Sequence, residues 1–437
     1  MTPKRRVCYQ ILALVLALAL IVPMLTACGD DDEDKTVTPS ATTPAATTPA
    51  KTTPAATTPA PTVSKEPVKI GVLIDYSGPA AQSGWLADCA ITFAEWYWNE
   101  KQGGIKVGDV RRPIEFDKYD TKNEVANTSA GARKLLLDKV VAITMGGISN
   151  QFAFPIADLT DPAKVLFSTF LVDKALFTDY KYVVSSFFNQ QSRNQLTAEL
   201  VVKKLQAKTV GIFAFDYAVQ RENMGRAKEA ILALDPTVKF TYEQYVQPDV
   251  KDYSPHLTRM KYEKPDVIIA DTTQDAWASI ANQIMGLGGL GEIKLVSMSE
   301  AGYFKGIEKS PGADGWYISL MFLPSSGIGT PAQLEFSNLW AEKCAADPAW
   351  CKKYSPTGAV PLPNTPVMYN PILTVIKAIE LAGTTDQAKV AEAARSGKLA
   401  FDSPLGHLKL GTDGKSNLAG FYIQMRDGKA VPAYGLE

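Results

Sequence analysis

Histidine, the side chain most often used for proton transfer, is scarce in this sequence. The two histidines, His256 and His407, lie far apart on unremarkable segments. No cysteine, histidine or acidic residues follow the spacing of a metal site. We therefore predict that the protein is not an enzyme and carries neither a metal nor a cofactor.

One glycine motif matches a cofactor-binding pattern. Residues 286–291 read Gly-Leu-Gly-Gly-Leu-Gly, the G-x-G-x-x-G of dinucleotide-binding turns. Such turns need a strand before the glycines and a helix after them, so that the helix N-terminus faces the pyrophosphate. Here a predicted helix comes first and a strand beginning at Lys294 follows, so the motif predicts a helix end and a loop. Asp413-Gly414 similarly predicts a turn between strands rather than a calcium loop.

The N-terminal residues indicate export. Lys4, Arg5 and Arg6 precede an apolar run from Ile11 to Val22, which is too short to cross about 30 Å of hydrocarbon. Residues 1–27 are therefore predicted to be a signal peptide. Leu-Thr-Ala-Cys28 resembles the lipobox of bacterial lipoproteins, which implies cleavage before Cys28 and a lipid on its sulfur. The alternative is a plain secretory signal with an incidental cysteine.

The segment 28–66 is predicted to be a disordered tether. It holds an acidic run at 30–34 and repeats Thr-Thr-Pro-Ala, with prolines at 44, 49, 54 and 59. Nothing in this composition can form a core. Proline at this density favours an extended chain of about 3 Å per residue, which would reach roughly 100 Å from a membrane.

The other cysteines fall into two environments. Cys344 and Cys351 flank the six residues Ala-Ala-Asp-Pro-Ala-Trp, and two such close cysteines in an exported protein predict a disulfide. Two reduced surface thiols are the alternative. Cys89 lies in an apolar helical stretch and is predicted to be a buried free thiol, whereas Cys8 leaves with the signal peptide.

Charge excludes one class of partner. The chain has 45 basic and 46 acidic residues and a formal net charge of −1, whereas a nucleic-acid partner would need a basic face. No apolar run after Val22 approaches the length of a membrane span. The body is therefore predicted to be soluble and to lie outside the cytoplasmic membrane.

Strand and helix patterns alternate from Val68 onward. Apolar runs predict strands, and apolar spacing of three to four residues predicts the helices between them. This alternation predicts an α/β fold of parallel, doubly wound sheets covered by helices, and the length favours two sheets. Ligands of such sheets bind at the carboxyl ends of strands and, with two lobes, in the cleft between them. The predicted strands are 68–74, 114–119, 140–145, 165–169, 209–213, 240–245, 267–270 and 294–297.

An ordered series of motifs resembles the type I periplasmic binding proteins, in particular the leucine/isoleucine/valine-binding group. It begins with Asp75-Tyr-Ser-Gly-Pro, Asn99-Glu-Lys-Gln-Gly-Gly and Asp120-Thr-Lys-Asn. It continues through Asp216-Tyr217-Ala218, Lys264-Pro-Asp-Val267 and Tyr369-Asn-Pro-Ile372. The resemblance covers residues 68–430.

This resemblance implies two lobes joined by three chain crossings, near 185–188, 319–322 and 420–423. Lobe I would comprise residues 67–186 and 322–419, and lobe II residues 187–321 and 420–437. It also implies a function: the lobes would capture a small solute, such as an amino acid, amide or organic acid, close on it and deliver it to an ABC permease.

The family's ligand-binding loops map onto particular residues. Trp85 could cap an apolar solute or pack against the helix that it begins, and Asn150 could donate to a carboxylate or cap the helix that follows. Glu300 stands where amino-acid binders often hold the ligand ammonium, which implies a cationic or donor-rich ligand; a solvated loop glutamate is the alternative. The predicted ligand-binding residues are Ser83, Trp85, Asn150, Gln151, Thr169, Phe170, Tyr217, Val219, Thr272 and Glu300.

The sequence departs from the amino-acid binders in two of these loops. Those proteins cradle the ligand carboxylate with small hydroxyl residues, but this chain has Phe152, Phe154, Phe170 and Leu171. This difference argues against an α-amino acid ligand.

Together these features predict a monomeric ABC-importer solute-binding lipoprotein, anchored by lipid at the outer face of the bacterial cell membrane or in the periplasm. A ligand-sensing subunit that signals to a membrane receptor is the alternative, because the fold fits both functions.

Overall fold

The structure, a computed structural model, describes residues 62–147, 150–303, 306–323, 327–355 and 358–436. All of them belong to the compact unit Pro59–Glu437. The predicted signal peptide, the predicted lipid site Cys28 and most of the predicted tether lie outside the described residues. Thr62–Val63 forms strand β1, which pairs in parallel with Val110–Arg111. The prediction of disordered chain as far as residue 66 is therefore wrong at this end.

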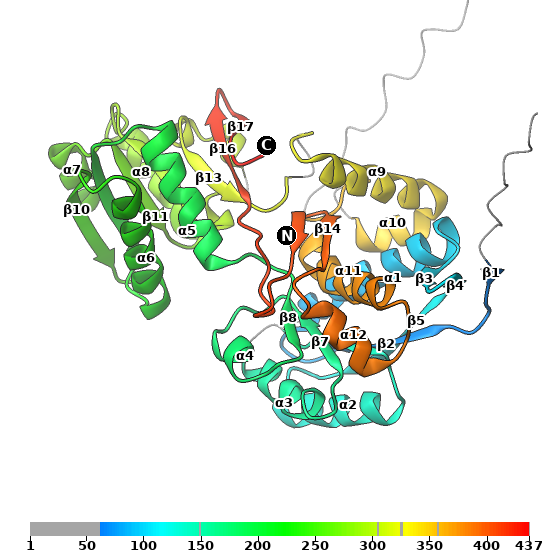
Figure 1. Cartoon of the computed structure of the whole chain (residues 1–437). Coiled ribbons are helices and arrows are strands. Elements are labelled where there is room, and N and C mark those ends of the chain that lie inside the picture. The colour runs from blue at the N-terminus through cyan, green and yellow to red at the C-terminus, as the bar shows by residue number, and fades with distance from the viewer. Residues whose placement is uncertain (1–61, 148–149, 304–305, 324–326, 356–357, 437) are drawn as a thin grey trace, which may run out of the picture. The chain divides into compact units, whose positions relative to one another are not determined.

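One sheet has five parallel strands in the order β5-β2-β6-β7-β8 (Figure 1). Four of these strands are short, mostly buried runs, as expected of strands covered on both faces, whereas β5 at one edge carries charged residues and is only partly buried. Their bounds are β2 Val68–Ile74, β5 Ile114–Asp120, β6 Ala142–Met145, β7 Leu166–Thr169 and β8 Val183–Ser185.

Helices cover both faces of this sheet and form two apolar cores with it. One core includes side chains of α2, α3 and α4, and the other includes side chains of α1 and α9 to α12. Two small sheets accompany them, formed by β1, β3 and β4 and by β14 and β15. The bounds are α1 Ala81–Glu95 with π-helix η1 Trp96–Lys101, α2 Val125–Leu137, α3 Asn150–Thr160, α4 Ala175–Thr178, α9 Pro331–Ala346, α10 Pro348–Tyr354, α11 Thr365–Ala382, α12 Gln387–Ala394, β3 Ile105–Val107, β4 Val110–Arg112, β14 Ala400–Ser403 and β15 Gly406–Lys409.

A second sheet has seven strands in the order β10-β9-β11-β12-β13-β16-β17. The first five are parallel, and β16 and β17 add antiparallel pairs at one edge. Cores on its two faces include side chains of α5 and α6 and of α7 and α8. The bounds are β9 Thr209–Phe215, β10 Lys239–Val246, β11 Val267–Asp271, β12 Lys294–Ser297, β13 Tyr317–Leu320, β16 Phe421–Arg426, β17 Lys429–Tyr434, α5 Gln190–Glu199 with π-helix η2 Leu200–Lys204, α6 Ala218–Leu234, α7 Ser254–Glu263, α8 Gln274–Gly286, and the 3-10 helices η3 Glu300–Gly302, η4 Ile307–Lys309 and η5 Pro311–Ala313.

The chain passes between the two sheets three times: from β8 to α5, from β13 to α9, and from β15 to β16. The first and third crossings are hydrogen-bonded to each other. Ser185 N donates to Gly414 O at 2.9 Å, and Asn189 N donates to Leu418 O at 2.7 Å. The buried Asn370 on α11 adds a bond from its Nδ2 to Ser186 O at 3.0 Å.

The predicted α/β class with parallel sheets is confirmed, and each predicted strand overlaps one in the structure. The glycine motif is a helix end and loop, as predicted, since α8 ends at Gly286 and β12 begins at Lys294. The antiparallel β17 was not predicted. Within the described residues, no helix combines the length and apolar character needed to cross a membrane.

The three cysteines of the described residues lie close to α10. Cys344 on α9 and Cys351 on α10 are joined, with Cα atoms 4.6 Å apart, a separation that suits a disulfide. Cys89 is free and buried, as predicted. Its Sγ lies 3.9 Å from the carbonyl oxygen of Tyr354 at the end of α10.

We predict that the exported protein carries the Cys344–Cys351 bridge. The double variant Cys344→Ser/Cys351→Ser should lose about 2–3 kcal/mol of unfolding free energy, because the unfolded chain regains the entropy of the closed loop. Urea denaturation measures this loss, with Cys89→Ala as a control that leaves the loop closed. Free thiols at both positions in the alkylated, non-reduced exported protein would contradict the bridge.

Candidate solute-binding site

The carboxyl end of the five-stranded sheet begins the site. Asp75, buried directly after β2, accepts hydrogen bonds from the Thr121 hydroxyl and from Asn123 N at 3.1 Å. These bonds fix the loop between β2 and α1. Gly84 lets the first turn of α1 approach this loop, because a Cβ there would lie 2.0 Å from Asp75 O.

Two predicted ligand residues meet beside Asp75. Ser83 and Phe170 line one small cavity, together with Gly147 and Met368. Its volume is about 10 Å³, which is space for a single water molecule at most. A solute needs more room than this edge of the sheet encloses by itself.

Thr169 has a structural role in the sheet. Its side chain is fully buried, and its Oγ1 donates to Met145 O at 2.8 Å and accepts from Leu171 N at 3.2 Å. The hydroxyl thus joins the ends of β6 and β7. Its donor is committed to the backbone rather than offered to a ligand.

Trp85 lies in the first turn of α1 and packs against the core. Its ring centroid is 5.9 Å from that of Tyr354 on α10, which favours the packing interpretation. Tyr354, Tyr76 and Lys118 donate hydrogen bonds to Asp88, one turn farther along α1. Burial raises the pKa of this carboxyl, but these bonds outweigh burial and lower the pKa below its usual value.

The other two predicted residues of this edge lie at the start of α3. Asn150 is the first residue of the helix, and Gln151 is exposed. Residues 148 and 149, which precede them, lie outside the described residues. The proposed roles of Asn150 in capping or binding therefore stay predictions.

The second sheet supplies Glu300, which the structure pairs with a cation. Its Oε1 lies 2.5 Å from Nη2 of Arg193, and the two side chains are 42 % and 4 % exposed respectively. Arg193 is on α5, and its guanidinium stacks 3.9 Å from the ring centroid of Phe188. The glutamate is thus partly exposed and already paired with a cation of the protein.

A second acid lies near this pair. Asp271, at the end of β11, accepts a hydrogen bond from Ser299 Oγ at 2.8 Å. Burial raises its pKa because it disfavours the charged carboxylate, while the Ser299 bond and the charge of Arg193 act in the opposite direction. Thr272 follows it and is buried, whereas Tyr217 and Val219, at the start of α6, are 45 % and 56 % exposed.

Glu300 lines a cavity of about 480 Å³, a size that suits a small solute. Its lining comes from segments of both lobes and is mostly apolar. Among the described residues of that lining, Glu300 is the one charged side chain. The lining residues are Leu86, Phe187, Gln274, Glu300, Ala301, Tyr303, Leu320, Met321, Phe322, Leu323, Leu362, Pro363, Asn364 and Val367.

The sequence analysis missed most of this lining. The sequence offered a reason to select Gln274, because it follows Thr272 and Thr273 directly after a strand end. Phe187 was also indicated, as the first of two adjacent phenylalanines in a predicted crossing. No such reason pointed to Arg193, since it stands inside a polar stretch of helix.

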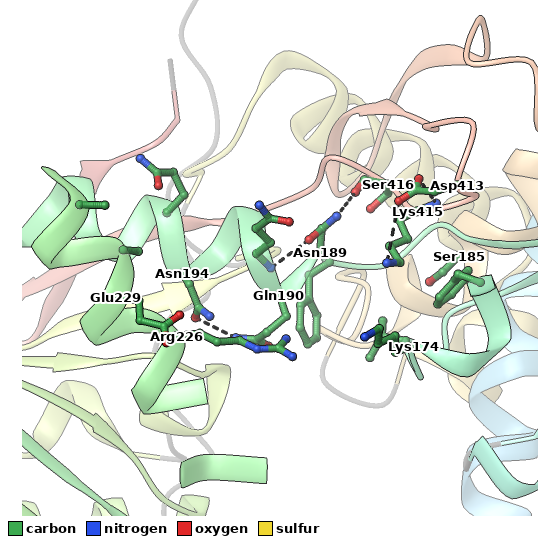
Figure 2. Close-up of a pocket in the computed structure, with 17 residues that line it drawn as sticks. Lys174, Ser185, Asn189, Gln190, Asn194, Arg226, Glu229, Asp413, Lys415 and Ser416 are labelled. Atoms are coloured by element: carbon green, nitrogen blue, oxygen red, sulfur yellow. Dashed lines mark hydrogen bonds and ion pairs between the residues drawn. The ribbon is translucent and has the colours of Figure 1, made fainter. Parts of the chain in front are cut away.

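Figure 2 shows a different cavity, of about 600 Å³, beside the first and third crossings. It contains none of the predicted ligand residues. Its charged side chains are of both signs: Lys174, Arg226 and Lys415, with Glu229 and Asp413. Gln190 and Asn194, one turn apart on α5, line it, whereas Arg193 faces Glu300.

Metal chemistry has no candidate in the described ranges, where no three histidine, cysteine or acidic side chains come together to hold an ion.

We predict that Thr169→Val will destabilise the fold without changing solute recognition. The variant leaves the buried Met145 carbonyl without its donor, which should cost about 1–3 kcal/mol of unfolding free energy. Urea denaturation measures the cost, and Thr169→Ser, which keeps the hydroxyl, is the control. A loss of solute affinity without a loss of stability would instead place Thr169 in the binding site.

Comparison with known proteins agrees with this architecture. A family model described as periplasmic binding protein matches residues 67–429. The leucine-, isoleucine-, valine-, threonine- and alanine-binding protein of Pseudomonas aeruginosa is 22% identical over 374 residues, which cover 82% of this chain and 89% of the relative.

Two solved structures show the same fold. One is a branched-chain amino acid transporter substrate-binding protein of Streptococcus pneumoniae in complex with isoleucine, with a TM-score of 0.60 and 18% identity over 84% of this chain and 99% of that one. The other is an ABC-transporter solute-binding protein of Rhodopseudomonas palustris in complex with 3,4-dihydroxybenzoic acid, with a TM-score of 0.58 and 21% identity over 84% and 98%. These relatives are binding proteins rather than enzymes, in agreement with the sequence prediction. The chain belongs to the type I periplasmic binding proteins, in the group that resembles the leucine/isoleucine/valine-binding protein.

Proposed function

We propose that the protein is the lipid-anchored solute-binding component of an ABC importer. The observation that carries this proposal is the cavity at Glu300, whose lining includes Leu86 of α1 and Asn364 before α11 as well as Gln274 of α8. Residues from both lobes contribute to one solute-sized space. A solute in that space would stabilise the arrangement in which both sets of residues reach it.

The cavity supports a solute with an apolar body and a few polar groups. Apolar side chains make up most of the wall, while Gln274, Glu300, Tyr303 and Asn364 supply the polar contacts. Amino acids and aromatic acids both fit this description, and the relatives above bind one or the other. The predicted contacts of Trp85, Asn150, Tyr217 and Thr272 remain part of the proposal.

The anchor is proposed from the sequence. A lipidated Cys28 would hold the protein at the membrane, since each buried CH₂ of the acyl chains adds about 0.8 kcal/mol. The Thr- and Pro-rich residues after it would separate the folded unit from the bilayer, where a permease could receive the solute.

We predict that a bound solute will compact the protein. A thermal-shift screen with isoleucine, benzoate, 4-hydroxybenzoate and short-chain amides finds the solute, because a ligand at 100 times its Kd adds about 2.7 kcal/mol of stability. Small-angle scattering should then give a smaller radius of gyration with that solute, and Glu300→Ala should weaken binding by more than about tenfold for a solute that donates a hydrogen bond to this carboxylate. Binding without compaction would refute the closure mechanism.

We also predict that Cys28→Ser will release the protein from membranes. The expected result is a shift from the membrane fraction to the soluble fraction after cell disruption, with Cys89→Ser remaining in the membrane fraction. Unchanged fractionation of Cys28→Ser would exclude the lipid anchor.

A further inference from the structure

Arg193 occupies an unusual place for a cation. The side chain is 4 % exposed, and its guanidinium lies between the ring of Phe188 and the carboxylate of Glu300. Its Nε is buried and has no hydrogen-bond partner among the described residues. Burying a cation costs desolvation free energy, and the cost is large unless the charge is paired.

The ion pair with Glu300 compensates the buried charge of Arg193. It also changes how Glu300 can interact with a ligand. A free carboxylate in the cavity would attract a ligand ammonium and repel a ligand carboxylate. With the guanidinium 2.5 Å away, the positive charge that this carboxylate requires comes from the protein. A solute ammonium would therefore have to compete with Arg193 for Glu300.

Asp271 does not replace Glu300 as the holder of an ammonium. One Asp271 oxygen accepts a hydrogen bond from the Ser299 hydroxyl, and burial raises the pKa of Asp271 above its usual value. The positive charge of Arg193 acts on both acids, as the ion-pair partner of Glu300 and as a charge that lowers the pKa of Asp271. Removing the guanidinium would leave two carboxylates uncompensated, which is a large local change in charge.

The opposite edge of the site agrees with this picture. In amino-acid binders the resemblance implies a hydroxyl cradle for the carboxylate that accompanies the ammonium. Here the Thr169 hydroxyl donates to Met145 O, and Phe170 fills space beside Ser83. Within the described residues of this edge, the Thr169 hydroxyl is therefore not offered to a ligand carboxylate.

We infer that Arg193 is a specificity-determining residue, which acts through Glu300 and sets the site for carboxylate solutes that have an apolar body and no ammonium group. This inference rests on the proposed solute-binding function and narrows its substrate class. Arg193 neutralises the charge of Glu300, so Glu300 does not repel a solute carboxylate. For the same reason a solute ammonium finds no unpaired carboxylate to bind.

The test compares two solutes that differ only in the ammonium group: isoleucine and 3-methylpentanoate. Isothermal titration at low salt should show wild-type protein binding 3-methylpentanoate at least tenfold more tightly than isoleucine. Arg193→Gln should shift this ratio at least tenfold toward isoleucine, because Glu300 is then free. Glu300→Gln should shift it in the other direction, since Arg193 is then unpaired, and it serves as the second variant if Arg193→Gln does not fold.

Arg226→Gln is the matched control, because Arg226 belongs to the cavity of Figure 2 and pairs with Glu222 on the surface. It should leave the ratio unchanged. Wild-type protein that prefers isoleucine would overturn the inference, as would variants that leave the ratio as it was. If the protein binds neither compound nor benzoate, the substrate class is wrong; the importer proposal would then fail only if no other solute compacts the protein.

Discussion

The hydrogen bonds between the chain crossings are the constraint on which the rest of the site depends. Ser185 N bonds to Gly414 O and Asn189 N bonds to Leu418 O, so the first and third crossings run together. Asn189 also caps α5 through its side chain, which accepts from Gln191 N and Ser192 N. The crossing therefore fixes where α5 starts and, with it, the position of Arg193.

This arrangement connects the cavity at Glu300 to the first crossing. Phe187 lines the cavity at Glu300. The ring of Phe188 packs against the guanidinium of Arg193 and lines the cavity of Figure 2. The two rings lie 4.5 Å apart in an edge-on contact. Glu300, Arg193 and Phe188 thus form a continuous series of contacts from the cavity to the first crossing.

The sequence predicted the sheets well because buried parallel strands are short apolar runs with helices between them. It predicted the site only in part, because side-chain partners depend on contacts between distant positions. Glu300 lines the cavity, but its partner lies 107 positions away, in a helix with no apolar pattern. Thr169 was chosen for its hydroxyl, and nothing in the sequence shows that a backbone carbonyl already uses it.

Trp85 illustrates a choice that the sequence left open. Its packing against Tyr354 depends on α10, a helix that the sequence analysis did not assign and that is tied to α9 through Cys344 and Cys351. Asp88 extends the same contact, because it accepts hydrogen bonds from Tyr354 of α10 and from Tyr76 beside the first site loop. The short cysteine loop thus lies behind α1, on which Trp85 and Asp88 stand.

The most direct test of the account is a crystal structure with the solute that gives the largest thermal stabilisation. The account predicts electron density for the solute in the cavity at Glu300, in contact with at least one residue from each lobe, and Arg193 still paired with Glu300. A solute found in the cavity of Figure 2, or held by residues of one lobe alone, would contradict it.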